Sequence, residues 1–175
     1  MTNPDAFSTS ELCQALADAL QQRGWMMATA ESCTGGLIAG ACTDLSGSSN
    51  WFERGFVTYS NQAKTDLLGV DARALQTEGA VSEAVARAMV QGALRHAPVQ
   101  VAVAVTGVAG PTGGSPAKPV GTVWFGWNID GAVSTQVQHF AGDRAAVRAA
   151  TVQHALAQLL ALTSGTPAAA SGHGD

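Results

Sequence analysis

The chain has 175 residues, of which 46% are hydrophobic and 13% charged, and its formal net charge is −4 at pH 7. This composition excludes a disordered or fibrous protein, and the length fits one domain. The acidic balance argues against binding to a nucleic-acid backbone. Neither a secretory signal nor a membrane span is predicted, so we expect a cytoplasmic protein without membrane partners.

The first half of the chain alternates helix and strand signals. Ser8 and Glu11 form a capping box before a helix that Gly24 ends. Gly69 closes a later helix, and Ser82 caps a longer one. The predicted elements are, in order, a strand at 25–29, a helix from 37 to about 46, a strand at 55–59, a helix at 62–68, a turn at 71–76 and a helix from 83 to Pro98.

The second half begins with a strand at 99–105 that reads as buried on both faces. A long glycine-rich loop at 106–119 follows, and then two strands at 120–129 and 132–140. Asp143 caps a last helix. We therefore predict a three-layer α/β/α domain over residues 8–163, with a mixed, mostly parallel sheet and one antiparallel hairpin, and a disordered tail at 164–175.

Residues 30–36, which follow the predicted strand at 25–29, place two hydroxyls, a thiol and two glycines between a strand and a helix. The start of a helix offers unpaired N–H groups, so a nucleophile there would have oxyanion donors beside it. Ser32, Cys33 and Thr34 are the candidate nucleophiles, and no histidine is placed to activate the thiol. The alternative is that a hydroxyl only caps the helix.

Tyr59 is the chain's single tyrosine, and Lys64 is one of two lysines. A helix that starts at Asn61 would put Lys64 one turn in, on a side that Tyr59 can reach. Lysine acts as a base only when its pKa is lowered, at a cost of about 1.4 kcal/mol for each unit. The alternative is an exposed lysine on a helix and a tyrosine at the sheet edge.

The glycine-rich loop follows the buried strand and would lie at the same sheet edge as Ser32. It is neither a P-loop nor a dinucleotide fingerprint, so we expect a pocket wall. Arg144 and Arg148 open the last helix, where a cation opposes the helix dipole; they are candidates for a phosphate or for solvated surface charge. The four histidines are scattered, and we expect neither a metal nor a cofactor.

Five blocks of the sequence resemble the CinA C-terminal family over most of the chain. They lie at residues 30–36, 55–64, 79–82, 106–114 and 118–123. The resemblance implies hydrolysis of nicotinamide mononucleotide to nicotinate mononucleotide and ammonia, in a stand-alone form, as part of pyridine nucleotide salvage.

The resemblance and the residues together suggest roles for single side chains. Ser32 would attack the carboxamide, Lys64 would be the general base, and Tyr59 would relay or orient the proton. The remaining predicted substrate-binding residues are the oxyanion donors Thr34, Gly35 and Gly36, the pocket residues Asn61, Thr106, Gly107 and Gly110, and the phosphate ligand Arg144.

Three other interpretations stay open at this point. The first is a catalytically inactive nucleotide-binding or regulatory module linked to competence or DNA damage. The second is an amidase that uses Cys33, and the third is an interaction protein whose glycine loop docks a partner. A homodimer is a general expectation for small α/β enzymes.

Overall fold

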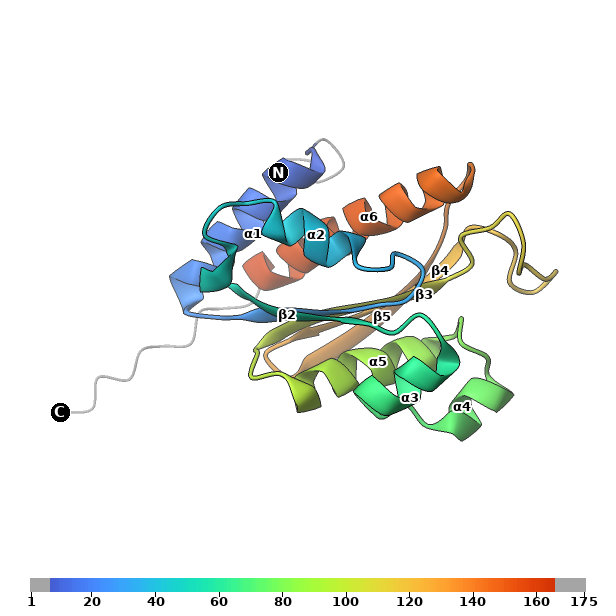
Figure 1. The fold of residues 1–175 in the computed structure, drawn as a ribbon. Coiled ribbons are helices and arrows are strands. Elements are labelled where there is room, and N and C mark those ends of the chain that lie inside the picture. The colour runs from blue at the N-terminus through green and yellow to red at the C-terminus, as the bar shows by residue number, and fades with distance from the viewer. Residues whose placement is uncertain (1–6, 166–175) are drawn as a thin grey trace.

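The computed structural model describes residues 7–165 as a five-stranded sheet between two layers of helices (Figure 1). The strands are β1 (Met27–Glu31), β2 (Phe52–Val57), β3 (Val101–Gly107), β4 (Thr122–Ile129) and β5 (Ala132–His139). The helices are α1 (Thr9–Arg23), α2 (Leu37–Thr43), α3 (Asn61–Leu68), α4 (Ala72–Thr77), α5 (Glu83–His96) and α6 (Arg144–Gly165), with a short 3-10 turn, η2 (Ser48–Asn50).

The strand order is β2-β1-β3-β4-β5. Strand β1 runs parallel to both neighbours, whereas β4 is antiparallel to β3 and to β5. The predicted mixed, mostly parallel sheet is confirmed: β1, β2, β3 and β5 run in one direction, and β4 runs in the opposite one. Because parallel strands end at the same sheet edge, the segments after β1, β2 and β3 meet there.

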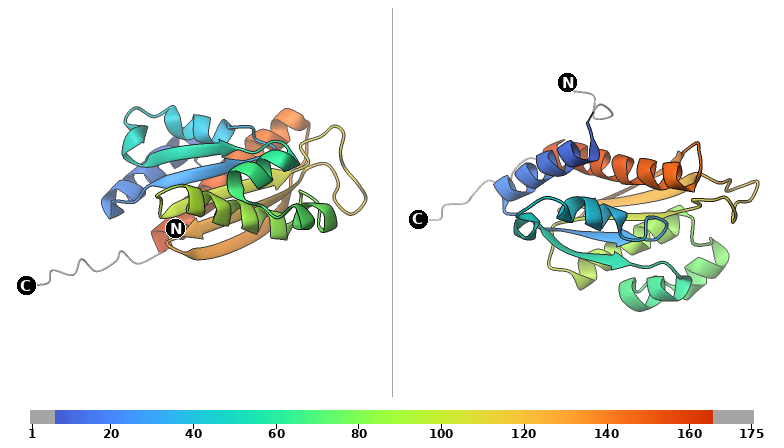
Figure 2. Two further views of the ribbon diagram at one scale, coloured as in Figure 1. Left: turned by 60° about the horizontal axis from the view of Figure 1, so that its bottom comes forward. Right: turned by 45° about the horizontal axis from the view of Figure 1, so that its top comes forward.

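Each face of the sheet carries its own core. Helices α1, α2 and α6 cover one face, and α3, α4 and α5 cover the other (Figures 1 and 2). On the first face, the rings of Phe125 and Trp127 stack with centroids 5.3 Å apart. On the second, Met89 and Val90 of α5 pack on alanines of the central strands. Strand β3 is buried along almost its whole length, as predicted.

The capping signals located the helix ends well. The Ser8–Glu11 capping box is present, and Gly24 and Gly69 end α1 and α3 in the left-handed region, with φ of 65° and 66°. Asp143 accepts a hydrogen bond from the Ala146 N–H at 2.9 Å and so caps α6. Helix α6 continues through Gly165, two residues past the predicted domain end. The rest of the predicted tail lies outside the described residues.

The boundaries of β1, β2 and β3 differ from the prediction by two or three residues. Strand β1 lies at Met27–Glu31, not at 25–29. The predicted strand ended before Glu31, but the side chain of this polar residue is buried and Glu31 belongs to the strand. Strand β2 starts at Phe52 because that residue pairs with the first residue of β1. The glycine-rich loop correspondingly starts after Gly107, where β3 ends.

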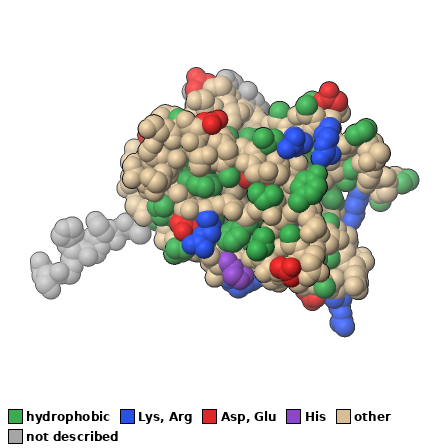
Figure 3. Space-filling model, viewed as in Figure 1, with side chains coloured by type: hydrophobic (Ala, Val, Ile, Leu, Met, Phe, Trp, Pro, Cys, Tyr) green, Lys and Arg blue, Asp and Glu red, His purple; other side chains and the backbone are tan. Residues whose placement is uncertain are grey.

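The surface carries few charges. On the face in Figure 3, small groups of basic and acidic side chains are scattered among hydrophobic ones. Within residues 7–165, no helix combines the length and the apolar character that crossing a bilayer requires.

Candidate active site

A cavity of about 230 Å³ lies at the edge where β1, β2 and β3 end. Residues from five segments line it: the turn after β1, the segment from β2 into α3, the connection before α5, the end of β3 with its loop, and the start of α6. Its lining includes the predicted residues Ser32, Tyr59, Asn61, Lys64, Thr106, Gly107 and Arg144. Residues that are far apart in the sequence therefore meet around one small space.

Ser32 and Lys64 are in direct contact at this cavity. Ser32 follows β1 directly, and its N–H donates to the carbonyl of Val105 in β3 at 3.1 Å. Lys64 lies in the first turn of α3, which Ser60 caps. The Nζ of Lys64 is 2.9 Å from the Oγ of Ser32 and 3.0 Å from the carbonyl oxygen of Thr58. The pair is shielded from water, since Ser32 is 8% exposed and Lys64 only 1%.

Burial favours the uncharged form of this amine. Desolvation lowers the pKa of Lys64 from its ordinary value, and the nearby Cys33 opposes this to a smaller extent. Two oxygen atoms surround Nζ, and no carboxylate is bonded to it. A neutral amine satisfies both contacts, because it can donate one hydrogen to the Thr58 carbonyl while its lone pair accepts the Ser32 hydroxyl hydrogen.

The turn that carries Ser32 is held from both sides. Arg148 of α6 donates through Nε to the carbonyl of Cys33 and through Nη2 to that of Thr34, each at 3.1 Å. On the other side, the buried carboxylate of Glu31 accepts from the Thr34 hydroxyl and from N–H groups of α2. Sequence reasoning gave Glu31 no role. The signal in the sequence is an acid at the end of an apolar strand, between two threonines.

The predicted oxyanion donors lie behind the cavity and not in its lining. Thr34 is fully buried, and its hydroxyl donates to Glu31 at 2.7 Å. The Gly35 N–H donates to the carbonyl of Ser32 at 3.0 Å, so it is already engaged. Gly36 is the N-cap of α2, with φ 101°, a conformation that favours glycine. The glycines shape the turn, and the Gly35 N–H is not free for an oxyanion.

Tyr59 and Arg144 lie together at the mouth of the cavity. Tyr59 is 59% exposed, and its hydroxyl accepts a hydrogen bond of 2.7 Å from Nη2 of Arg144. The same guanidinium donates through Nη1 to the carbonyl of Gly110 at 2.8 Å. The tyrosine hydroxyl is thus bonded to Arg144 and not to Lys64 or Ser32. Asn61, the first residue of α3, lies at the exposed rim.

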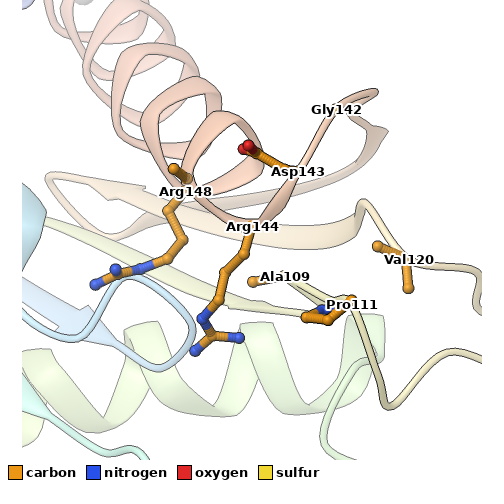
Figure 4. A pocket seen from close by; sticks show the side chains of 8 residues that line it. Ala109, Pro111, Val120, Gly142, Asp143, Arg144 and Arg148 are labelled. Atoms are coloured by element: carbon orange, nitrogen blue, oxygen red, sulfur yellow. The ribbon is translucent and has the colours of Figure 1, made fainter.

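A second, larger hollow of about 630 Å³ adjoins the first. The two share Ala109 and Arg144, and the larger one lies between the glycine-rich loop and the start of α6. Figure 4 shows Arg144 and Arg148 extending side by side from α6, with Pro111 and Val120 of the loop to one side of Arg144.

Thr106 and Gly107 close the inner wall of the smaller cavity. The Thr106 hydroxyl donates to the carbonyl of Ala80 at 2.8 Å, which ties β3 to the segment before α5. A side chain at Gly107 would collide with β4, since a Cβ there would lie 2.7 Å from Val123 Cγ2.

Cys33 lines the cavity but is not activated. Burial raises the pKa of its thiol to about 11, so the group is a neutral thiol near pH 7. Of the three candidate nucleophiles in the turn, Ser32 is the one in contact with the buried amine of Lys64.

Comparisons with known proteins place this chain in a family. The family model of the CinA C-terminal domain matches residues 9–163. A relative from Enterobacter agglomerans named nicotinamide-nucleotide amidohydrolase PncC is 58% identical over 139 residues, which are 79% of this chain and 85% of that protein. A relative of the same name from Pseudomonas putida is 52% identical over 151 residues, or 86% and 94% of the two chains.

Solved structures agree with these sequence matches. The crystal structure of competence damage-inducible protein A (ComA) from Klebsiella pneumoniae has a TM-score of 0.89 at 42% identity, covering 92% of this chain and all of that one. That of a competence/damage inducible protein from Agrobacterium tumefaciens has a TM-score of 0.86 at 47% identity, covering 88% and 94%. The expected family is confirmed: the chain belongs to the CinA C-terminal domain family.

Proposed function

We propose that this protein hydrolyses the carboxamide of nicotinamide mononucleotide to nicotinate mononucleotide and ammonia, with Ser32 as the nucleophile and Lys64 as the general base. The observation that carries the proposal is the 2.9 Å contact between Ser32 Oγ and the buried Nζ of Lys64. The names of the relatives from Enterobacter agglomerans and Pseudomonas putida support the substrate.

The first half of the reaction transfers the acyl group to the serine. The neutral amine of Lys64 takes the proton from Ser32 Oγ as that oxygen attacks the carboxamide carbon. The carbonyl oxygen of the substrate becomes an oxyanion. The ammonium of Lys64 then gives its proton to the leaving nitrogen, the carbon–nitrogen bond breaks, and ammonia departs. A nicotinoyl ester on Ser32 remains, and Lys64 is neutral again.

The second half hydrolyses this ester. Lys64 removes a proton from water, the resulting hydroxide attacks the ester carbon, and the ammonium of Lys64 returns the proton to Ser32 Oγ as the ester bond breaks. One water is consumed, and the acid and ammonia are released. Burial supports this cycle because it lowers the pKa of Lys64 and so favours the uncharged amine with which the cycle starts.

The backbone next to Ser32 is the proposed oxyanion site. The N–H groups of Gly35, Ile38 and Ala39 already donate within the protein. The N–H group of Cys33, which follows the nucleophile directly and belongs to a residue that lines the cavity, is the donor that we assign to the oxyanion.

The two adjoining cavities suit the two parts of the substrate. The smaller one has room for the pyridine ring and its carboxamide, and the larger one for the phosphoribosyl group. Arg144 lines both, so we assign it to the phosphate. Tyr59 would orient this arginine through their 2.7 Å hydrogen bond, in place of the proton relay that the sequence suggested.

Ammonia release from nicotinamide mononucleotide by purified variants tests the proposal. Ser32→Ala and Lys64→Met should each lower kcat by about 10³-fold or more, because each removes one half of the nucleophile–base pair. Ser48→Ala, a serine outside the cavity, is the matched control and should keep the wild-type rate.

Two results would contradict the proposal. Wild-type activity in Ser32→Ala would exclude the serine mechanism. Binding of the nucleotide by the wild type without any ammonia release would instead favour the inactive nucleotide-binding module.

A further inference from the structure

Glu31 makes an unusual set of contacts for a carboxylate. It is fully buried at the end of β1, directly before Ser32. Its Oε1 accepts from the Thr34 hydroxyl at 2.7 Å and from the Ile38 N–H at 2.8 Å. Its Oε2 accepts from the Ala39 N–H at 3.0 Å and from the Thr29 hydroxyl at 3.2 Å. Four donors therefore surround one acid, and none of them is a cation.

These contacts fix the two ends of the Ser32 turn relative to each other. Helix α2 has Gly36 as its N-cap, and no side chain at that position caps it. The Glu31 carboxylate takes over this task from the opposite end of the turn, because Ile38 and Ala39 belong to the first turn of α2. Ser32 lies between the strand that Glu31 ends and the helix that Glu31 caps.

The main chain of Glu31 is also linked to Lys64, through Thr58. The carbonyl of Glu31 accepts from the Thr58 N–H at 2.8 Å, and the carbonyl of Thr58 accepts from Lys64 Nζ at 3.0 Å. Glu31 thus contacts the segments that carry both members of the pair, through its side chain on the Ser32 side and through its main chain on the Lys64 side.

We infer that Glu31 is a positioning residue that holds Ser32 Oγ within hydrogen-bonding distance of Lys64 Nζ. Its relevance to catalysis rests on the function proposed above, whereas its effect on the geometry does not. A glutamate is required because a carboxylate is an acceptor only, and all four partners are donors.

Glutamine has nearly the same shape but cannot replace this acceptor set. Whichever way its amide is turned, the NH₂ group takes the place of one oxygen. It then faces either the Ile38 N–H or the Ala39 N–H, and neither of these can become an acceptor. One backbone donor of the turn loses its partner in either orientation, and the turn must shift.

Three variants test this inference. Glu31→Gln should lower kcat for ammonia release by about 100-fold, as a displacement of about 1 Å between reacting groups can do, while KM stays within a few-fold of the wild type. Thr34→Val removes only one of the four donors and should cause a smaller loss. Thr43→Val, which removes a hydroxyl bonded within the same helix, is the matched control and should have no effect.

A crystal structure of the Glu31→Gln variant separates this inference from the proposed function. The distance between Ser32 Oγ and Lys64 Nζ should exceed 3.5 Å, the limit for a hydrogen bond. An unchanged 2.9 Å distance would overturn the inference, and so would an unchanged kcat. If the wild type released no ammonia, the proposed function would fail, but the distance would still decide the role of Glu31. If Glu31→Gln did not fold, the distance in Thr34→Val would decide instead, and an unchanged pair there would count against the inference.

Discussion

Replacing Lys64 with methionine should change how the free energy of unfolding depends on pH. The amine is 1% exposed, and burial lowers its pKa below the ordinary value of 10.5. In the unfolded chain the same group has its ordinary pKa. Between the two values, the unfolded state therefore holds a proton that the folded state has released. Unfolding becomes less favourable as the pH rises through this window, so the wild type gains stability there.

The expected magnitude follows from the single proton involved. Relative to Lys64→Met, the free energy of unfolding of the wild type should rise by up to about 1.4 kcal/mol for each pH unit inside the window. The slope should vanish above pH 10.5, where both states carry a neutral amine. The loss of the bond to Thr58 adds an offset of about 1 kcal/mol, but this offset does not depend on pH in the same way.

Urea denaturation of both proteins between pH 6 and 10.5 measures the difference. Titrating groups other than the neighbouring Cys33 contribute equally to both proteins and cancel. Lys118→Met is the comparison variant, because it removes the chain's other lysine, which is less buried. A difference between wild type and Lys64→Met that stays constant over the whole range would refute the reasoning, since Lys64 would then be charged in the folded protein and unable to act as a base.

Three further outcomes are expected. Arg144→Met should raise KM for nicotinamide mononucleotide by about 10- to 100-fold with a smaller effect on kcat, because a charge-assisted hydrogen bond to the phosphate is lost; steady-state kinetics will test this, and an unchanged KM would place the phosphate elsewhere. Cys33→Ala should retain most of the ammonia release, since the thiol is neutral near pH 7, and an inactive variant that still binds substrate would point to the thiol as nucleophile. Gly107→Ala should lower the free energy of unfolding by about 1–3 kcal/mol in urea denaturation, because its Cβ would lie 2.7 Å from a methyl group of Val123; wild-type stability would mean that β4 can move away.

Local chemistry made much of the fold predictable. A capping serine and a terminating glycine form hydrogen bonds only with residues a few positions away in the sequence. Ser8 and Gly69 therefore marked the start of α1 and the end of α3 correctly. The hairpin at Asp130-Gly131 is of the same kind, with φ of 48° and 90° at its two turn residues. The ends of a strand depend instead on its partner strand and on the burial of polar side chains. The predicted positions of β1 and β2 were therefore shifted along the chain from the observed ones.

The candidate site was predictable in its members but not in its contacts. The sequence indicated Ser32 and Lys64 as candidates, whereas only the folded chain shows them 2.9 Å apart. Glu31 was missed because an isolated acid in a sequence is usually solvated, and the threonines on either side of it do not by themselves reveal that four donors will converge on it. The hydroxyl of Tyr59 is bonded to Arg144, which lies 85 positions further along the chain, and no spacing rule predicts such a partner.

The glycine-rich loop between β3 and β4 is tied down near both of its ends. Arg144 holds the carbonyl of Gly110, and Nζ of Lys118 donates to the carbonyl of Glu78 at 2.6 Å. The residues between these two points are exposed. Insertions or deletions at the loop's tip would therefore leave the walls of both hollows in place, so the tip of this loop can change in length without altering the shape of either hollow.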